Sequence, residues 1–597
     1  MRVPTRKNTL FLVSLWLMAF VFSPFQVKAG DAVIESVLAY YPSLETAPAN
    51  TQSFAEIAKL TLYEMDGAFK FQGDLRAFYE QRDFRPLWMA DGRPDASARQ
   101  LLDLIETSWS HGLNPHQYNL QRLSSLADSN LVESSAVHQV VFDLMLSDSF
   151  SKLAYDMTSI RVDPEKVNID PSHWRTPASA TNILRRVGHK QESPGAVFES
   201  LKPDNALYDE LRLALMKEIS LLNDRGMGGS PESFGEPGGK PEQSADIFIH
   251  PKTEHALIPK IRAHLIRFYG LDGESQSRFY DTHLIQLVKQ FQRRHNIIED
   301  GVIGPDTLAM MNKGRIERIY QLMANLERLR WIDFNRPDKY IVINIPSARL
   351  WAIDNGRIEH QMPVVVGRPE RPTISFVASI KGVRFNPSWT IPDTIKTDDI
   401  FPQAQDNPDI FTDKNIQVFA GYNADAPTLD PQAVNWQSLS SNAVRRYKLV
   451  QRPGDDNPLG RVRFLMFNPY DIYLHDTNEP HHFKRSYRAL SSGCVRLSEP
   501  EKLAEFVLGG SRGWQKGDTA EYIRAGEEVD IRGGADIPVY LLYLTNWFRH
   551  DGNLTYGPDI YGYDSNLIDL LRHKDAIFIP ENDFSMVSSS PVSQKSG

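Results

Sequence analysis

A glycine- and proline-rich segment divides this chain into at least two separately folded parts. Between Arg225 and Pro241 the sequence reads RGMGGSPESFGEPGGKP, so glycine and proline supply nine of 17 residues. Glycine loses the most conformational freedom on folding and proline lacks a backbone N–H, so this segment disfavours regular helix or strand. The chain has 597 residues, 41% of them apolar, which is enough for several hydrophobic cores. We therefore expect a linker over residues 226–248.

The sequence before the linker has the periodicity of α-helices. Apolar residues recur at spacings of three and four in residues 101–105 and 140–145. The segment Phe78–Trp88 concentrates aromatic side chains, which we interpret as core packing. No catalytic motif is visible in residues 30–225, so we expect a helical scaffold domain there.

The sequence just after the linker predicts a second, smaller helical unit. Leu284, Leu287 and Phe291 fall on one face of a helix. A second helix is expected to start at Gly304-Pro305, because proline is favoured in the first helical turn. Residues 249–315 are therefore either a binding module or a purely structural helical hairpin.

From Tyr340 onward the pattern changes from helical to β. Runs of β-branched residues are bounded by turn residues, and Asn355-Gly356 is a typical hairpin turn. Residues 393–455 interrupt this pattern with Asp-, Asn- and Pro-rich sequence, and so long an insertion is either a lid or a surface loop. The expected strands are residues 340–346, 349–354, 357–366, 529–531 and 538–544, with two short strands between residues 462 and 474.

The only cysteine of the chain, Cys494, lies in the loop Ser491–Leu497. A thiol titrates near pH 8.5 and is a good nucleophile at neutral pH only beside a base or a positive field. His475, at the end of an expected strand, is the obvious base. The backbone N–H groups of Gly493 and Cys494 can face a developing oxyanion. A lone buried cysteine is often an inert small residue, but the nearby histidine and the Ser-Ser-Gly frame favour catalysis.

Metal binding is the competing interpretation of the same region. Five potential ligands lie close together in the sequence, but they crowd around Pro480 and match no common zinc spacing, and no second cluster appears. The sequence therefore predicts neither a metal nor a cofactor. These five residues are His475, Asp476, Glu479, His481 and His482.

Residues 1–29 have the features of a cleavable signal peptide. Arg2, Arg6 and Lys7 precede an apolar run at residues 10–22, and small residues at 27–29 fit cleavage. The run is shorter than the roughly 20 apolar residues that span a bilayer. We expect export with cleavage, and retention by an N-terminal membrane anchor is the alternative. Removing four basic residues changes the formal charge from −9 to −13, which disfavours nucleic acid as a partner.

The sequence His-Asp-Thr at 475–477, followed by Ser-Ser-Gly-Cys-Val-Arg at 491–496, resembles the active-site signature of the L,D-transpeptidases. The segment Phe78–Trp88 resembles the start of the scaffold domain in the large branch of this family. Residues 291–307, with Phe-Gln, Asp-Gly and Ile-Gly pairs and Thr307, resemble the helical peptidoglycan-binding module. Smaller members carry a second histidine where this chain has Ser492, so we assign Ser492 no base role.

The resemblance implies a multidomain α+β protein: a helical scaffold, a helical peptidoglycan-binding module and a mainly β catalytic domain with an inserted capping subdomain. The segments we expect are residues 1–29 as signal peptide, 30–225 as scaffold, 226–248 as linker, 249–315 as binding module, 316–337 as connecting helix, 338–536 as catalytic domain with 393–455 as its capping insertion, 537–584 as a segment that closes the domain, and 585–597 as a disordered tail.

The resemblance also implies the reaction. Cys494 would attack a peptidoglycan stem peptide at its third residue, release D-Ala as a thioester forms, and pass the acyl group to a second stem as a 3→3 cross-link. His475 would be the base, and carbapenems would acylate the thiol. The implied partners are donor tetrapeptides and acceptor stems in the periplasm, with other cell-wall synthesis proteins as further candidates. Alternatives are an L,D-carboxypeptidase or endopeptidase, a ligase for lipoproteins, and a non-catalytic wall-binding scaffold.

Three further residues have two interpretations each. Tyr473 shares a strand face with His475 and either donates to the oxyanion or packs. Arg496 alternates with Cys494 and binds either a stem carboxylate or a loop carboxylate. Trp389, at the start of the insertion, either lines the cleft or belongs to a core. The predicted substrate-binding residues are Ser492, Arg496 and Trp389.

Overall fold

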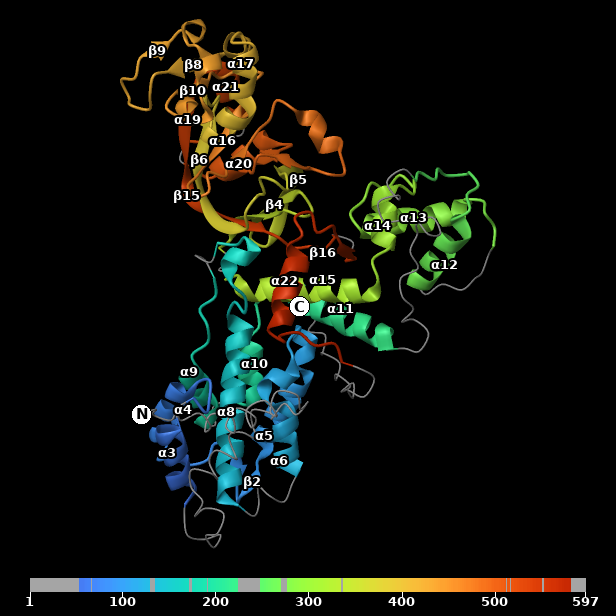
Figure 1. The fold of residues 1–597 in the computed structure, drawn as a ribbon, viewed down its shortest axis with the longest axis vertical. Helices are drawn as coiled ribbons and strands as arrows, with labels where there is room; N and C mark the ends of the chain where they lie inside the picture. Colours follow the sequence, from blue (N-terminus) through green and yellow to red (C-terminus); the bar gives the residue numbers. More distant parts are fainter. Residues whose placement is uncertain are drawn as a thin grey trace, which may run out of the picture. The chain divides into compact units, whose positions relative to one another are not determined.

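The computed structural model describes residues 53–65, 67–128, 135–170, 174–189, 192–223, 247–269, 276–333, 337–511, 513–515, 517–549 and 552–580 (Figure 1). The expected signal peptide, the expected tail and all but the last two residues of the expected linker lie outside these ranges. Two compact units are present, and each is described by itself. The first comprises residues up to Trp109, with 114–158 and 177–202; the second comprises 110–113, 159–176 and the chain from Pro203 onward.

The first unit is helical, as its apolar spacing predicts. The longest helix, α8, is buried on almost all sides because the shorter helices surround it. Among the described residues, no helix combines the length and the apolarity needed to cross a membrane. The elements of this unit are α3 (Phe54–Glu64), α4 (Gln72–Glu80), β1 (Met89–Ala90), β2 (Arg93–Pro94), α5 (Ala96–Glu106), α6 (Leu120–Asp128), α8 (Ala136–Thr158), α9 (Ala180–Gly188) and α10 (Pro194–Leu201).

A buried carboxylate fixes the aromatic segment Phe78–Trp88 against α8. Asp143 accepts hydrogen bonds from the Tyr79 hydroxyl and from the backbone N–H groups of Leu87 (3.0 Å) and Trp88 (2.8 Å). Burial raises the pKa of Asp143 to about 6, although these hydrogen bonds act in the opposite direction. The interpretation of this segment as core is confirmed, because Phe78, Tyr79 and Trp88 are buried, while Phe84 is partly exposed.

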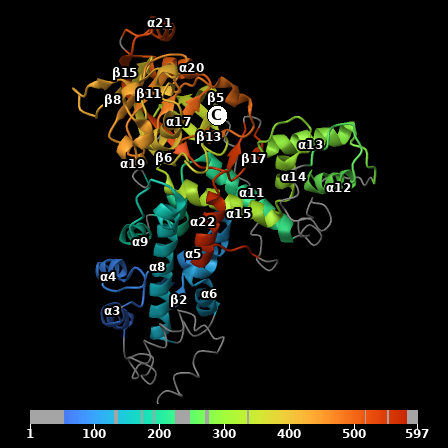
Figure 2. The ribbon, with the colours of Figure 1, turned by 45° about the horizontal axis from the view of Figure 1, so that its top comes forward.

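From Pro203 onward the second unit contains α11 (Ala206–Asn223), which precedes the expected linker in the sequence, and then the predicted small helical module. The module consists of α12 (Ile258–Tyr269), α13 (Thr282–Arg294) and α14 (Pro305–Met311), which form one cluster in Figures 1 and 2. The Gln292 side chain joins α13 to the turn before α14. Its amide nitrogen donates to the Val302 carbonyl (2.8 Å), and its oxygen accepts from the Gly301 N–H (2.9 Å). A compact core of its own surrounds this link.

The domain expected to be catalytic is built on a nine-stranded sheet with the order β13-β5-β14-β12-β11-β6-β15-β3-β4. An additional pairing of β5 with β4 closes the sheet into a ring, with β13 along its outside. Closure leaves few free strand edges. The strands are β3 (Lys339–Asn344), β4 (Arg349–Asp354), β5 (Arg357–Gly367), β6 (Phe376–Phe385), β11 (Val462–Met466), β12 (Leu474–His475), β13 (Ala489–Ser491), β14 (Val495–Leu497) and β15 (Val529–Leu542).

The remaining elements of this domain support the sheet. The helix α20 packs on β15 and β6, and β16 pairs with β17 as a separate hairpin. These elements are α20 (Pro500–Leu508), α21 (Asp518–Ala525), β16 (Asn546–Phe548), β17 (Leu554–Tyr556) and α22 (Tyr563–His573).

The expected division of residues 529–544 into two strands is wrong. Residues Val529–Leu542 form one strand, β15, which pairs with β6 along both of its halves. The register shifts between Arg532 and Ile537. Gly533-Gly534 interrupts the alternation from which strands are predicted, whereas a bulge absorbs the extra residues without ending the strand.

The insertion after β6 folds as a subdomain with its own sheet and core. Its sheet has the order β7-β10-β8-β9, and Phe401, Phe411 and Trp436 are buried in its core. The predicted fold class is therefore confirmed, capping subdomain included. Its elements are β7 (Trp389–Thr390), α16 (Asp393–Ile395), the π-helical turn η6 (Lys396–Ile400), α17 (Phe401–Asp406), α18 (Ile410–Asp413), β8 (Ile416–Phe419), β9 (Thr428–Leu429), α19 (Ser441–Val444) and β10 (Lys448–Gln451).

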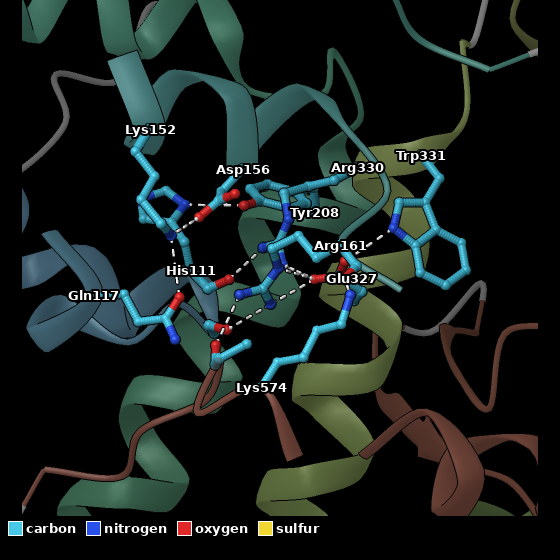
Figure 3. A network of polar contacts seen from close by, with 12 residues as sticks. His111, Gln117, Lys152, Asp156, Arg161, Tyr208, Glu327, Arg330, Trp331 and Lys574 are labelled. Carbon is cyan, nitrogen blue, oxygen red and sulfur yellow. Dashed lines mark hydrogen bonds and ion pairs between the residues drawn. The ribbon is translucent and has the colours of Figure 1, made fainter. Parts of the chain in front are cut away.

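A buried carboxylate network anchors α15 (Arg315–Trp331), which leads from the module to the sheet. Glu327 accepts from Arg161 (2.6 Å), from Arg330 and from the Trp331 indole N–H (3.0 Å), as Figure 3 shows. Burial alone would raise the pKa of Glu327, but the two guanidinium groups outweigh it and lower the pKa to about 2. The carboxylate is therefore ionised throughout the physiological range, and it balances two buried cations.

Glu327→Gln is expected to destabilise the second unit by about 3–5 kcal/mol, because it leaves buried guanidinium groups without their counter-ion. The measurement is the free energy of unfolding in urea. The matched control is Glu299→Gln, which breaks an exposed ion pair with Arg293 and should cost less than about 1 kcal/mol. Equal effects of the two substitutions would contradict the anchoring role of Glu327.

Candidate active site

The candidate site lies where β12 and β14 pair in parallel. Leu474 lies opposite Val495, and His475 lies opposite Arg496. Leu474 and Val495 are fully buried in the core of the sheet. Because side chains alternate along a strand, the flanking residues point to the other face. This register places Tyr473, His475, Cys494 and Arg496 on one face, although the two strands are joined by a long loop.

A cavity of ≈ 520 Å³ opens on this face. Its volume is in the range of small-molecule and peptide pockets. Trp389, His475, Ser492, Cys494 and Arg496, all predicted from the sequence, line it, whereas Tyr473 and Gly493 do not. The other lining residues are Pro392, Asp393, Thr394, Ile395, Asp399, Pro458, Leu459, Tyr470, Asp471 and Ser491.

The loop before Cys494 is fixed by two hydroxyl groups. Ser491 Oγ donates to the Cys494 carbonyl (2.6 Å) and accepts from the Gly493 N–H (3.2 Å). Thr373 Oγ1 donates to the Gly493 carbonyl (2.7 Å) and accepts from the Gly367 N–H (2.9 Å). Gly493 has φ +114°, a conformation that L side chains rarely adopt, so glycine is required at this turn. The predicted oxyanion donor, the Gly493 N–H, is thus engaged by Ser491 in this structure.

The Cys494 thiol is half-buried, and its Sγ–H donates to the backbone carbonyl of Asp471 at 3.6 Å. Burial raises the pKa of Cys494 above its ordinary value. The Tyr473 backbone, Arg463 and Arg496 act in the opposite direction without reversing the shift, while the charge of Asp471 adds to it. The thiol is therefore protonated at neutral pH in the free protein.

The imidazole of His475 is buried, and its Nδ1 lies 2.6 Å from the Asp476 carbonyl oxygen. A carbonyl can only accept, so Nδ1 carries the hydrogen and Nε2 is the basic nitrogen. Burial lowers the pKa of His475 to about 3, and Arg496 and Arg463 act in the same direction. The histidine is neutral at pH 7, as a base must be. The group that orients it is a backbone carbonyl, which no sequence pattern indicates.

The Asp476 carboxylate, adjacent in sequence, serves the backbone instead. It accepts from the N–H groups of Arg461 (2.8 Å) and Thr477 (2.7 Å). It also packs against Gly460, where an added Cβ would lie 2.3 Å from a carboxylate oxygen. Asp476 thus holds the end of β12 in place.

Arg496 and Tyr473 already have partners in this structure. The Arg496 Nη1 lies 2.6 Å from Glu479 Oε2. Of the two interpretations of Arg496, this contact matches the one in which it binds a loop carboxylate. The Tyr473 hydroxyl donates to the Asp471 carboxylate (3.3 Å), and the Arg463 guanidinium stacks 4.0 Å from the centre of its ring. Substrate binding by Arg496 and oxyanion binding by Tyr473 therefore remain predictions.

Arg371, which sequence reasoning missed, links the insertion to the nucleophile loop. Its Nη2 lies 2.6 Å from Asp398 and its Nη1 3.1 Å from Asp399, both in η6. The same Nη1 donates to Ser492 Oγ at 3.3 Å. Asp471, also missed, lies between a Tyr-Pro-rich turn and β12 and has φ +54°. Its place just before a strand that ends in histidine was the available signal.

Comparisons with known proteins agree with this geometry. Residues 338–531 match the family described as "L,D-transpeptidase catalytic domain", residues 254–311 the "Putative peptidoglycan binding domain", and residues 73–215 the "Scaffold domain". A curated protein of Haemophilus influenzae, named "Putative L,D-transpeptidase", is 32% identical over 248 residues. That match covers 41% of this chain and 48% of the relative, so the chain spans about half of the relative's length.

Solved structures were also matched. An L,D-transpeptidase from Mycobacterium smegmatis is 13% identical, with a TM-score of 0.17 over 34% of this chain and 58% of that chain. An LD transpeptidase in complex with imipenem is 14% identical, with a TM-score of 0.17 over 34% and 59%. The avibactam carbamoyl enzyme of another such protein is 12% identical, with a TM-score of 0.17 over 35% and 49%. These values add nothing to the family matches.

Alkylation of Cys494 by iodoacetamide is expected to be slow at pH 7 and to accelerate up to and beyond pH 9. The raised pKa of Cys494 keeps the thiol protonated, so the reactive thiolate fraction grows about tenfold per pH unit. Intact-protein mass spectrometry measures the rate without ambiguity, because the chain has one cysteine. His475→Ala should leave the profile in place, since the imidazole is neutral. A rate that levels off near pH 6 would instead indicate a thiolate–imidazolium pair.

Proposed function

This chain carries an L,D-transpeptidase catalytic domain and a peptidoglycan-binding module, and from that premise we propose that it forms 3→3 cross-links between peptidoglycan stem peptides through a Cys494 thioester. The observation that carries the proposal is the shared face of β12 and β14. It presents a thiol, a neutral imidazole and a guanidinium to one cavity. A nucleophile, a base and a carboxylate-binding group are what acyl transfer between anionic peptides requires.

In the first half-reaction the thiol gives its proton to Nε2 of His475, and the sulfur attacks the carbonyl carbon of the third stem residue. For this transfer the sulfur must turn from the Asp471 carbonyl towards the imidazole. The tetrahedral intermediate collapses as the bond to D-Ala breaks, and the imidazolium returns its proton to the leaving amine. The product is a thioester on Cys494.

Backbone groups of the nucleophile loop serve the oxyanion. The Gly493 N–H must leave Ser491 Oγ to do so, whereas the Cys494 N–H lies next to the reacting sulfur in the chain. The Gly493 carbonyl belongs to the same peptide group as the Cys494 N–H and points in the opposite direction, and Thr373 holds it by a hydrogen bond. Tyr473 is the further donor of this proposal, once its hydroxyl leaves Asp471.

In the second half-reaction Asp471 favours an amine acceptor over water. Three carboxylates line the cavity. Asp393 pairs with Lys396 and Asp399 pairs with Arg371, but Asp471 has no lysine or arginine within ion-pair distance among the described residues. Its negative charge opposes thiolate formation, so it does not serve nucleophile activation. A carboxylate beside the thioester instead attracts the ammonium group of a second stem.

The bound ammonium group first releases one proton to solvent. The neutral amine then attacks the thioester carbonyl and gives a second proton to His475, which passes it to the departing sulfur, so that Cys494 leaves as thiol. Hydrolysis of the thioester and transfer to a lipoprotein use the same residues, and hydrolysis is an outcome of the tests below. Export to the periplasm, where such a substrate lies, is part of the proposal, as is contact with other cell-wall synthesis proteins.

Cys494→Ala is expected to abolish the thioester and the cross-linked product while peptidoglycan binding persists, because the thiol supplies the covalent intermediate. His475→Ala should lower the acylation rate by about 10²–10⁴-fold, the usual contribution of a general base. Intact-protein mass spectrometry with disaccharide-tetrapeptide, or with a carbapenem, detects the adduct. An adduct on another residue would refute the nucleophile, and no adduct with either reagent would favour the non-catalytic scaffold.

Asp471→Asn is expected to leave thioester formation intact and to lower the ratio of transfer to hydrolysis about tenfold, which corresponds to ~1.4 kcal/mol. The loss should lie in the KM for the amine acceptor, because the substitution removes a charge that attracts it. Hydrolysis by uncharged water is the internal control. If the ratio is unchanged, Asp471 does not bind the acceptor. A parent protein that yields only tripeptide would identify a carboxypeptidase.

A further inference from the structure

The loop between β12 and β13 brings three metal-ligand side chains together outside the reacting groups. They are Glu479, His481 and His482, at the start of the short 3₁₀-helix η9 (Pro480–Lys484). One donor atom from each lies within 4.8 Å of the other two. His482 Nδ1 is 3.8 Å from Glu479 Oε2, and the two imidazole rings lie 4.2 Å apart with a tilt of 57°. The turn at Pro480 folds both histidines back towards Glu479.

One ring nitrogen of His482 is buried without a hydrogen bond. The His482 side chain is only 15% exposed, and its Nδ1 is inaccessible and lacks a hydrogen-bond partner. A buried polar atom of this kind is uncommon and costs stability unless a ligand satisfies it. The Oε2 atom of Glu479 lies 3.8 Å from this nitrogen, beyond hydrogen-bond range. The unsatisfied nitrogen thus points to a group that binds between the two side chains.

We propose that Glu479, His481 and His482 form a zinc-binding site. Two imidazoles and a carboxylate are the donor set of Zn²⁺ sites with three protein ligands, whereas Ca²⁺ and Mg²⁺ prefer oxygen ligands. With bonds of about 2.0–2.2 Å, tetrahedral ligand atoms lie roughly 3.4 Å apart. The present separations therefore need to shorten by little more than an ångström, which side-chain rotation supplies. A fourth ligand, such as water, completes the tetrahedral set of a zinc site with three protein ligands.

The site differs from the one that the sequence suggested and then disfavoured. Of the five clustered candidates, His475 is committed to the Asp476 carbonyl, and the Asp476 carboxylate to the backbone of Arg461 and Thr477. Zinc spacings in sequence describe ligands on regular elements. They do not cover a 3₁₀ turn in which two neighbouring histidines meet a residue two positions earlier.

Arg496 connects the proposed site to the cleft. Glu479 uses Oε2 for the guanidinium of Arg496, and its other oxygen remains for a cation. A divalent cation on Glu479 weakens the hold of this carboxylate on Arg496 by drawing on the same negative charge. Arg496 lines the cavity with Cys494, so zinc binding changes the charge available to substrates there.

The test uses the full chain carrying Cys494→Ser, which removes the only thiol that competes for the metal. Co²⁺ is added while its visible absorption is recorded, and Zn²⁺ affinity is measured by competition with a chromophoric chelator. One equivalent with the intense bands of tetrahedral Co²⁺ is expected. His482→Ala and His482→Gln should each weaken Zn²⁺ binding about 100-fold. Glu479→Gln should weaken it less. The matched control, His573→Ala, removes an exposed histidine of α22 and should have no effect.

Three results would overturn the site. The first is weak Zn²⁺ binding by the Cys494→Ser protein. The second is tight Zn²⁺ binding that a His481→Ala/His482→Ala double variant retains. The third is tight binding by the parent protein that Cys494→Ser alone removes, which would place the metal on the thiol. Because the readout is metal binding, none of these results depends on the transpeptidase reaction. Far-UV circular dichroism checks that each loop variant is folded.

Discussion

The parallel pairing of β12 with β14 is the constraint on which the active site depends. Two parallel neighbouring strands need a connection that carries the chain from the end of the first strand back to the start of the second. Here the loop after β12 and the strand β13 supply that connection. Each strand is also held on its outer side, β12 by β11 and β14 by β5. Leu474 and Val495 in the core therefore fix where His475 and Cys494 line the cavity.

The capping insertion and the nucleophile loop share one cation. Arg371 neutralises Asp398 and Asp399 of the insertion and also donates to Ser492, two residues before the nucleophile. Its neighbour Thr373 holds the carbonyl of Gly493. A displacement of the insertion would therefore move Arg371, and through its hydrogen bond to Ser492 it would displace the loop that carries Cys494. Substrate that enters beneath the insertion meets a wall of the cavity that is coupled to the nucleophile.

Sequence patterns predicted those structural elements that depend on residues close together in the chain. The Asn355-Gly356 hairpin and the helix pair at Gly304 depend on short-range rules, and both are present. That His475 and Cys494 lie at one cavity could be predicted, because their spacing in the sequence fits the motif that this chain resembles. Arg371 and Asp471 act through contacts with residues 20 or more positions away, and no local pattern encodes these. The continuity of β15 was missed because a bulge hides a long strand's alternation.

The electrostatics of the cysteine and histidine point to activation by substrate. A half-buried thiol with a raised pKa and a neutral buried imidazole form no ion pair at rest, so the proposed nucleophile is unreactive in the free protein. Thiolates are oxidised much faster than thiols. In the oxidising compartment that the proposed substrate implies, this low reactivity protects a chain that has one cysteine and no partner for a disulfide. In the proposed reaction the acylation step is slowed as a consequence, because binding of the stem peptide must bring the sulfur to the imidazole and stabilise the charge that develops.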